Sequence, residues 1–371
     1  MPMKTKHILP VIAGAMLGFM AMSSHAMPGR DDNVRDDIPG SVTQAYDVYG
    51  IAFYNLENLF DTINANGKYD LEFSPQGNRE WNSEKYWAKI NNMAYTISQM
   101  VSPSTPDGPA VIGISEVENR GVVEDLVKAD PLKGRNLQIV HHDSPDNRGI
   151  DVALLYDPNM FEVLNVTNTR LTEVNFPTRD QMAVTGVLGG LDTMTVIVCH
   201  WPSRLGGQEK SEPSRIAAGK LARHLADSLW NVNATQHIIV MGDLNDDPHN
   251  KAVSMRPGLG ASQKQKGVEK HGFFNPWWDI WEPDYRGTLS YKGAWNLFDQ
   301  IIVSGTLLDN KKGHGTGRLI YDSAVINDFD FLKNPPDSPY AGTPHRTYGG
   351  GQWLNGYSDH FPTEVFVRVR K

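Results

Sequence analysis

The feature that most constrains the fold is an alternation along the chain between short apolar bursts and amphipathic stretches. The bursts are rich in Val, Ile and Tyr, which favours β-strands. Two intervening stretches, residues 84–100 and 211–230, instead place apolar side chains at helical spacing. The pattern predicts an α/β protein in which helices pack on sheets. The predicted strands span residues 48–54, 110–114, 150–156, 193–199, 238–241, 300–303 and 363–369.

The N-terminal residues have the pattern of a secretory signal peptide. Lys4 and Lys6 precede an apolar run over residues 8–22, and small residues follow up to Ala26. The run is shorter than the roughly 20 residues that a membrane-spanning helix needs. We therefore expect cleavage near Ala26, a secreted or periplasmic protein, and no transmembrane segment in the mature chain. The polar residues 27–47 predict a flexible arm.

The remainder, residues 48–371, shows no linker, so one domain is expected. Segments 258–272 and 309–351 are rich in polar residues, Gly or Pro and predict long loops. Only one cysteine is present, Cys199, so no intrachain disulfide can form and packing must stabilise the fold. No protein partner can be inferred, and a monomer is expected.

The charge balance disfavours a polybasic protein. Lys and Arg total 35 against 43 for Asp and Glu, which gives a formal net charge of -8. Non-specific binding to nucleic acid or to anionic membranes depends on an excess of Lys and Arg. Local basic patches remain open, and the candidates for one are Arg148, Arg179, Arg204 and the lysines of residues 264–270.

Polar side chains follow the apolar bursts at several points. Taken singly, each could cap a turn or form a buried hydrogen bond. Taken together, their carboxylate and amide oxygens suit Mg²⁺ or Ca²⁺, and the chain lacks the clustered Cys and His typical of zinc sites. A shared cleft is therefore the stronger interpretation. The residues are Asn55, Glu116, His200, Asp243, Asn245, Asp299, Asp359 and His360.

Seven motifs carry a resemblance to a known family. The chain resembles the endonuclease/exonuclease/phosphatase superfamily from about residue 48 to residue 369. The resemblance implies a four-layer α/β sandwich of two packed mixed β-sheets flanked by helices, which is a deoxyribonuclease-like fold. It places the active site at one end, where loops converge. The motifs are YNLENLFD, ISEVEN, RGIDVALLYDP, HWPSR, MGDLNDDP, WNLFDQIIVS and SDHFPTEV.

The resemblance also implies a metal site in a catalytic domain spanning residues 48–371. Asn55 and Glu116 would hold Mg²⁺, with Asp359 as a further or water-mediated ligand, and Mn²⁺ or Ca²⁺ could replace Mg²⁺. A divalent cation of this kind neutralises the charge of a phosphodiester and orients water.

Catalytic roles follow from the same match. Asp243 would orient and deprotonate the attacking water, and Asn245 would fix that water or the phosphate. His360, held by Asp299, would donate to a non-bridging phosphate oxygen, since a carboxylate orients the ring and stabilises its protonated form.

His200 is expected to act as a phosphate donor or as the general acid for the leaving group, oriented by Asp151. The alternative is a buried histidine, hydrogen-bonded or beside Arg148. Arg148 and Arg204 are candidate phosphate contacts, although loop arginines often contact nothing. In the aromatic segment 277–295, most tryptophans are expected in the core. Tyr291 and Trp295 are candidates for the rim of the site.

The sequence favours an exported metal-dependent phosphodiesterase, most simply a nuclease that hydrolyses DNA or RNA. The alternative is a phosphatase or phospholipase-type hydrolase acting on sugar, inositol or lipid phosphates. Gln300 follows Asp299 where inositol-polyphosphate phosphatases of this superfamily typically carry arginine, which weighs against that branch. A non-catalytic binding protein is the weakest alternative, because the acidic residues and His360 are all present.

Overall fold

The computed structural model describes residues 46–63, 71–308 and 316–370. The predicted signal peptide and residues 27–45 of the predicted arm lie outside this part of the chain. The first strand begins at Tyr46, two residues before the predicted boundary, and Tyr46 and Asp47 pair with Arg370 and Val369. No helix among the described residues is long and apolar enough to cross a membrane.

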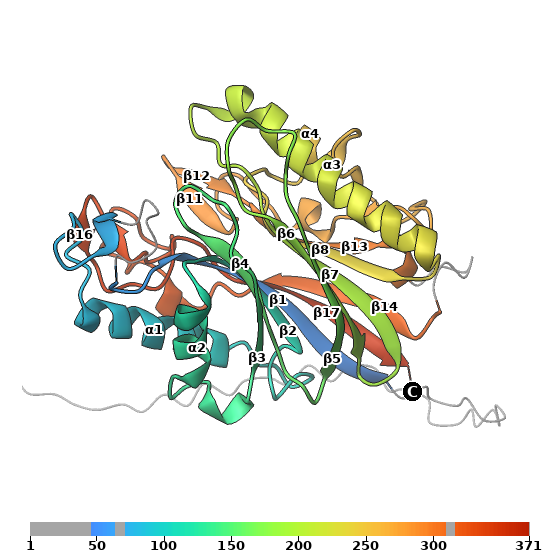
Figure 1. Ribbon diagram of the computed structural model, residues 1–371, viewed down its shortest axis with the longest axis horizontal. Helices are drawn as coiled ribbons and strands as arrows, with labels where there is room; N and C mark the ends of the chain where they lie inside the picture. Colours follow the sequence, from blue (N-terminus) through green and yellow to red (C-terminus); the bar gives the residue numbers. More distant parts are fainter. Residues whose placement is uncertain (1–45, 64–70, 309–315, 371) are drawn as a thin grey trace, which may run out of the picture. The chain divides into compact units, whose positions relative to one another are not determined.

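Two mixed β-sheets pack against each other (Figure 1). Among the described strands of the first sheet, only β1 (Tyr46–Leu59) and β2 (Val111–Val117) run parallel. In the second sheet the parallel pairs are β7 (Asp192–His200) with β8 (His237–Asp243) and β9 (Ala261–Ser262) with β10 (Phe273–Phe274). The first sheet has the order β14 (Leu319–Ile326), β17 (Thr363–Arg370), β1 (Tyr46–Leu59), β2 (Val111–Val117), β4 (Asp151–Tyr156) and β3 (Gln138–His141). The second has the order β5 (Phe161–Thr169), β6 (Gln181–Leu188), β7 (Asp192–His200), β8 (His237–Asp243), β13 (Asp299–Ser304), β10 (Phe273–Phe274) and β9 (Ala261–Ser262).

Helices cover the outer face of each sheet, which gives the four layers expected from the sequence (Figure 1). The first sheet is covered by α1 (Ser83–Ser98) and α2 (Arg120–Lys128), and the second by α3 (Gln208–Val232) with the short α4 (Lys251–Ser254). Smaller elements are the hairpins β11 (Leu289–Tyr291) with β12 (Ala294–Asn296) and β15 (Tyr348–Gly349) with β16 (Gln352–Trp353), and 3₁₀ turns η1 (Leu71–Phe73), η2 (Lys133–Arg135), η3 (Pro276–Asp279), η4 (Gly305–Leu307) and η5 (Asp330–Leu332).

The alternation of side chains along β1 explains why this strand contributes to two of the hydrophobic cores, one on each face of its sheet. Ile51 and Phe53 point into the core between the sheets, whereas Ala52 and Tyr54 pack toward α1. Successive side chains of a strand face opposite ways, so a strand that is buried on both faces is apolar throughout. This explains the continuous apolar bursts in the sequence.

The predicted strands and helices are confirmed, but the predicted loop over residues 309–351 is wrong in part. It contains β14, which pairs antiparallel with β17 and has a register shift between Tyr321 and Ser323. The polar pair Asp322-Ser323 at that shift interrupts the apolar pattern, which hides the strand in the sequence. Strand β5 was missed because it lies at the sheet edge with mostly half-exposed or exposed side chains.

Candidate active site

The site lies where the parallel pairs of the two sheets end. In β1 and β2, Asn55 pairs with Ser115, the residue before Glu116. In β7 and β8, His200 pairs with Asp243. Because parallel strands end at the same edge of a sheet, each pair brings two polar side chains together, and the packing of the sheets brings the pairs together.

Backbone strain is concentrated at this edge. Glu116 has a φ of 62°, and it occupies a β-bulge that shifts the register of β2 against both neighbouring strands. Glu57, Asn58 and Asn245 also have positive φ values, of 46°, 55° and 50°. Such conformations are costly for residues other than glycine, and they persist where the surroundings impose them. A bulge re-aims a side chain, and here it turns the Glu116 carboxylate toward His200.

Asp243 is a buried carboxylate with a contact on each oxygen. Asn55 Nδ2 donates to Asp243 Oδ2 over 3.0 Å, and the Asn245 backbone N–H donates to Oδ1 over 2.9 Å. His200 Nε2 lies 3.6 Å from Oδ2. Burial raises the pKa of Asp243 to about 7, although the charge of His360 opposes the rise. The group can therefore accept a proton near neutral pH.

His360 and Asp299 form a buried pair beside Asp243. His360 Nδ1 lies 2.6 Å from Asp299 Oδ2, and Asp299 pairs with Asp243 across β13 and β8. Burial alone would lower the pKa of His360, but the charge and hydrogen bond of Asp299 outweigh burial and raise that pKa well above its usual value. His360 is therefore cationic at neutral pH. Ligating atoms of Asp243, Asp299 and His360 all lie within 4.8 Å of one another.

His200 is buried in a different electrostatic environment. Its Nε2 lies 3.8 Å from Glu116 Oε1, and its Nδ1 has no hydrogen-bond partner among the described residues. Burial, assisted by the charges of Arg179 and Arg148, lowers the pKa of His200 well below its usual value. The imidazole is therefore neutral at neutral pH, unlike that of His360.

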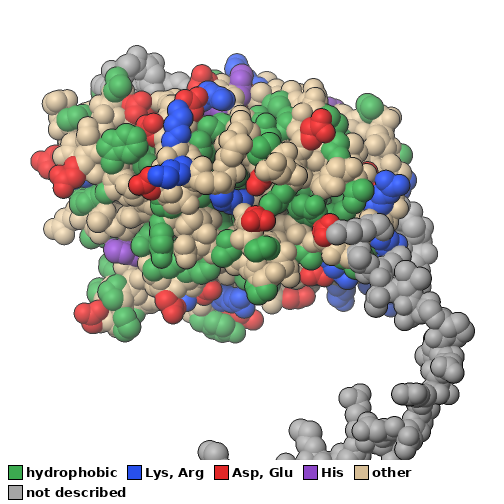
Figure 2. Space-filling model, turned by 90° about the horizontal axis from the view of Figure 1, so that it is seen from below, with side chains coloured by type: hydrophobic (Ala, Val, Ile, Leu, Met, Phe, Trp, Pro, Cys, Tyr) green, Lys and Arg blue, Asp and Glu red, His purple; other side chains and the backbone are tan. Residues whose placement is uncertain are grey.

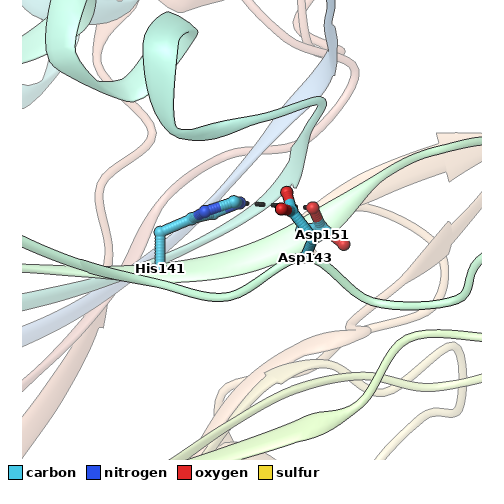
Figure 3. Close-up of side chains that lie close together, drawn as sticks. All are labelled: His141, Asp143 and Asp151. Carbon is cyan, nitrogen blue, oxygen red and sulfur yellow. Dashed lines mark hydrogen bonds and ion pairs between the residues drawn. The ribbon is translucent and has the colours of Figure 1, made fainter. Parts of the chain in front are cut away.

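Asp151 does not orient His200, which corrects the sequence-based expectation. Its carboxylate accepts from the Ser144 backbone N–H over 2.7 Å and lies 3.2 Å from His141 Nε2 (Figure 3). Asp151 begins β4 and His141 ends the adjacent strand β3, so their side chains meet at the edge of the first sheet. Asp143 lies beside the same pair.

The oxygen atoms around Glu116 fit a divalent cation. Glu116 Oε2 accepts from the Asn58 backbone N–H over 2.9 Å and lies 3.5 Å from Arg148. Within the described residues no hydrogen bond reaches Oε1. Among the described residues, Asn55 Oδ1 accepts only from the Glu57 backbone N–H, over 2.9 Å, so a lone pair remains. Hard oxygen donors with spare lone pairs suit Mg²⁺, Mn²⁺ or Ca²⁺.

The third predicted ligand, Asp359, lies at the rim of this group. Its Oδ2 accepts from an Arg346 terminal nitrogen over 2.8 Å, and its Oδ1 lies 3.9 Å from His360 Nε2. The Asp359 side chain is more exposed than Glu116, at 30% against 12%. Its position is compatible with the water-mediated role.

Comparison with known proteins identifies the family. The model of the Endonuclease/Exonuclease/phosphatase family matches residues 50–371. The chain belongs to this family. Its members hydrolyse phosphate esters, so a phosphoester hydrolase is the general class, and they depend on divalent metals. No curated protein was found to match the chain.

Solved structures share the fold of this family member at low sequence identity. TDP2 from C. elegans superposes with a TM-score of 0.52 and 14% identity, covering 86% of this chain and 75% of that one. Humanized D. rerio TDP2 superposes with a TM-score of 0.51 and 13% identity, covering 86% of this chain and 98% of that one. A family protein from Bacteroides thetaiotaomicron gives 0.50 and 14%, covering 88% and 99%. Likeness at this identity shows the fold alone.

Arg204 is not placed as a free phosphate contact, which corrects its predicted role. Its Nε donates to the Asn245 carbonyl over 2.9 Å, and a terminal nitrogen donates over 2.9 Å each to Asp247 and Asn250. Its guanidinium also stacks over Phe298. Since these contacts use its donors, Arg204 holds the strand-end loop that carries Asn245. Arg148, by contrast, is 46% exposed and contacts Glu116 and Asn58.

The remaining predicted residues are divided between core and surface. Tyr291 is 64% exposed at the tip of the β11–β12 hairpin. Trp295 is half-buried and stacks on Phe361, next to His360 in the chain, with ring centroids 6.0 Å apart. The amide nitrogen of Asn245 donates to the Trp201 carbonyl over 3.1 Å, and within the described residues its Oδ1 accepts no hydrogen bond.

A second layer of polar residues was missed by sequence reasoning. Lys89 of α1 is fully buried and donates to Thr347 Oγ1 and, over 2.9 Å, to the Tyr357 carbonyl. Glu57 accepts from the Thr347 backbone N–H over 2.7 Å and from Arg346 over 3.3 Å. These contacts hold the loop that carries Asp359 and His360. Burial lowers the pKa of Lys89 to about 8 and raises that of Glu57 to about 7.

The sequence held one signal for this layer. Lys89 lies four residues before Met93 and eight before Ile97, so it shares the buried face of α1 with apolar residues. A lysine on a buried face requires polar partners from elsewhere in the fold. Nothing in the sequence indicated that those partners lie in residues 347–357.

A neutral His200 predicts that the side chain acts as a hydrogen-bond donor and not as a general acid. His200→Ala should lower kcat by about 10–100-fold, the cost of losing a hydrogen bond to a charged group. His200→Gln should recover much of the rate, because it keeps an N–H donor. For each variant, the loss of kcat should be the same on a p-nitrophenyl ester as on a nucleotide ester in steady-state assays. An inactive Gln variant, with a larger loss on the nucleotide ester, would restore the acid role.

Proposed function

We propose that this family member is a divalent-metal-dependent phosphodiesterase, most simply a nuclease acting on DNA or RNA. The observation that supports this best is that a carboxylate able to accept a proton and a positively charged histidine lie side by side at the ends of the strands. Asp243 has a pKa near 7 and can take a proton, while His360 beside it carries a positive charge. Hydrolysis of an anionic diester needs both a base for water and a cation for the developing charge.

Each side chain of the site has a separate role in the proposed hydrolysis. Asp243 orients the attacking water and takes its proton, and Asn245 Oδ1 is available to fix the same water. His360, held by Asp299, donates to a non-bridging oxygen as negative charge grows there. The neutral imidazole of His200 donates a hydrogen bond to the phosphate. Asn55 and Glu116, with Asp359 at the rim, would hold Mg²⁺, which when bound neutralises phosphate charge.

Two observations bear on the substrate. Gln300 is buried, and its amide nitrogen donates to the carbonyls of Asp246 and Leu297, so both of its N–H groups are used within the protein. This supports the nuclease over the inositol-phosphate alternative. On the face shown in Figure 2, basic and acidic side chains of the described residues are interspersed and form no continuous basic field. The formal net charge of -8 disfavours avid binding along a duplex, so a short or single-stranded substrate is favoured.

The proposal includes export. The charged start, apolar run and small residues before Ala26 support cleavage there and a secreted or periplasmic enzyme. N-terminal sequencing of the protein recovered outside the cytoplasm should begin at Met27. An intact Met1 in active material would contradict the export proposal and leave the chemistry untouched.

The experiment that tests the function compares substrates with and without metal. We expect Mg²⁺ or Mn²⁺ to support cleavage of bis-p-nitrophenyl phosphate and of DNA or RNA, and exhaustive chelation to abolish it reversibly. Inositol phosphates serve as the competing substrate. Release of inorganic phosphate from them at a higher kcat/KM than nucleotide cleavage would favour the phosphatase alternative. Full turnover after chelation would overturn the metal assignment.

A further inference from the structure

A small polar cavity adjoins the candidate active site at the C-terminal end of β1. It has a volume of about 210 Å³. Its lining includes Glu57 and Asn58 from the end of β1, Phe73 and Arg79 from the segment before α1, and Arg346 with Tyr348 from the segment before His360. The cavity thus combines two guanidinium groups and two aromatic rings.

The cavity is connected to the proposed metal ligands by single hydrogen bonds. The Asn58 backbone N–H donates to Glu116 Oε2 over 2.9 Å, and Arg346 donates to Asp359 Oδ2 over 2.8 Å. A substrate group in the cavity would therefore be separated from a phosphate at Glu116 by a single residue of the lining. Neither the fold nor the sequence motifs account for a cationic cavity at this position.

Arg79 is held in a fixed orientation with donors to spare. Its guanidinium lies over the rings of Tyr348 and Phe73, 5.0 and 5.9 Å from their centroids. The Tyr348 hydroxyl donates to the Arg79 carbonyl over 2.9 Å, and Arg79 Nε donates to Glu72 over 3.3 Å. Among the described residues, its two terminal nitrogens have no hydrogen-bond acceptor. Arg204, by contrast, uses its donors within the protein.

Arg346 presents a second cation to the same cavity. Its Nε contacts Glu57 over 3.3 Å and one terminal nitrogen contacts Asp359, which leaves the other terminal nitrogen without an acceptor in the described part of the chain. Glu57 is the one carboxylate in the lining, and its oxygens already accept from Thr347 and Arg346. The free guanidinium nitrogens of Arg79 and Arg346 therefore favour an anionic ligand in the cavity.

We propose that this cavity binds a second phosphate group of the substrate, next to the one that is hydrolysed. The inference rests on the proposed function and deepens it. The volume is below the roughly 300 Å³ of the smallest typical ligand pockets, so one anionic group fits and a whole substrate does not. The planar fork of arginine matches phosphate oxygens and binds them bidentately. The adjacent phosphate of a nucleic acid strand and a second monoester of an inositol phosphate share this chemistry.

The test replaces Arg79, because Arg346 contacts a proposed metal ligand. Wild-type enzyme should cleave the thymidine dinucleotide pTpT or TpTp with a kcat/KM about 10-fold above that of TpT, which has one phosphate. Arg79→Gln should remove that preference while leaving the hydrolysis of TpT and bis-p-nitrophenyl phosphate unchanged. Arg120→Gln, an exposed arginine on α2 that pairs with Glu124, is the matched control and should retain the preference.

Direct binding separates this inference from the proposed function. By calorimetry, thymidine 3′,5′-bisphosphate should bind wild type about 10-fold more tightly than thymidine 5′-monophosphate, and Arg79→Gln should equalise the two. The same comparison with inositol 1,4-bisphosphate and inositol 1-phosphate identifies the source of the phosphate. If bis-p-nitrophenyl phosphate is not cleaved, the proposed function fails while the binding comparison still tests the cavity. Equal affinities in wild type, or an unchanged preference in Arg79→Gln, would overturn the second-phosphate site.

Discussion

Asp243→Asn is expected to lower kcat by about 10²–10⁴-fold, the range for loss of a positioned general base. Asparagine keeps the shape and one acceptor, but its amide cannot take a proton from water. The KM should change little, because the side chain contacts Asn55 and the Asn245 backbone and is not a principal substrate contact. Steady-state kinetics on bis-p-nitrophenyl phosphate and on an oligonucleotide would measure both constants.

The pH dependence follows from the raised pKa of Asp243. Burial raises that pKa from 3.8 to about 7, so the carboxyl is protonated and inactive as a base below about pH 7. Wild-type activity should therefore rise with pH through about 7. In Asp243→Asn this rise should disappear from whatever activity remains. An unchanged acid limb in the variant would show that another group controls it.

Stability provides the control for folding. Because the folded-state pKa of Asp243 lies above its unfolded value, this group destabilises the fold increasingly as pH rises from about 4 to about 7. Asparagine removes that penalty and loses one acceptor, so the melting temperature at pH 8 should stay close to wild type. Asp227→Asn, the same change on a half-exposed residue of α3, should leave kcat unaltered. Retention of most of the activity by Asp243→Asn would refute the base assignment.

Glu116→Gln is expected to reduce turnover to background and to remove the response of the protein to divalent cations. Glutamine keeps the hydrogen bond from Asn58 but loses the charge that attracts a cation. In wild type, Mg²⁺ or Mn²⁺ should raise the melting temperature, since a ligand that binds only the folded state stabilises it. Glu116→Gln should show no such rise, and Mn²⁺ affinity measured directly should fall by at least about 10-fold.

The matched control for Glu116 is Glu124→Gln, on the exposed face of α2 between Arg120 and Lys128. This variant should keep both activity and the cation-induced rise in melting temperature. Without metal, Glu116→Gln should melt close to the wild-type temperature, because glutamine keeps the shape of the side chain and the hydrogen bond from Asn58. Unfolding of Glu116→Gln, or an undiminished response to Mn²⁺, would contradict its role as a ligand.

The positions of the strands and of most site residues could be predicted from the sequence for a physical reason. Strands buried on both faces must be apolar throughout, so β2, β7 and β8 are visible as uninterrupted bursts and their ends as abrupt polar residues. Edge strands carry no such signal, because one side faces water. Strand β5 was missed for that reason. Strand β14 was hidden by the polar pair Asp322-Ser323, and the central strand β6 was missed although most of its residues are buried.

The sequence by itself determined which residues end the buried strands, because a buried strand is an uninterrupted run of apolar residues and the first polar residue marks its end. Only the tertiary structure decided which of those residues meet. Asp151 pairs with His141 instead of His200 through the neighbouring strands β4 and β3, and Arg204 is used by the loop that it supports. His200 and His360 have the same side chain, yet the charge and hydrogen bond of Asp299 keep His360 protonated, while burial and the charges of Arg179 and Arg148 keep His200 neutral. Protonation depends on distances between segments far apart in the chain, and those distances exist only once the two sheets have packed.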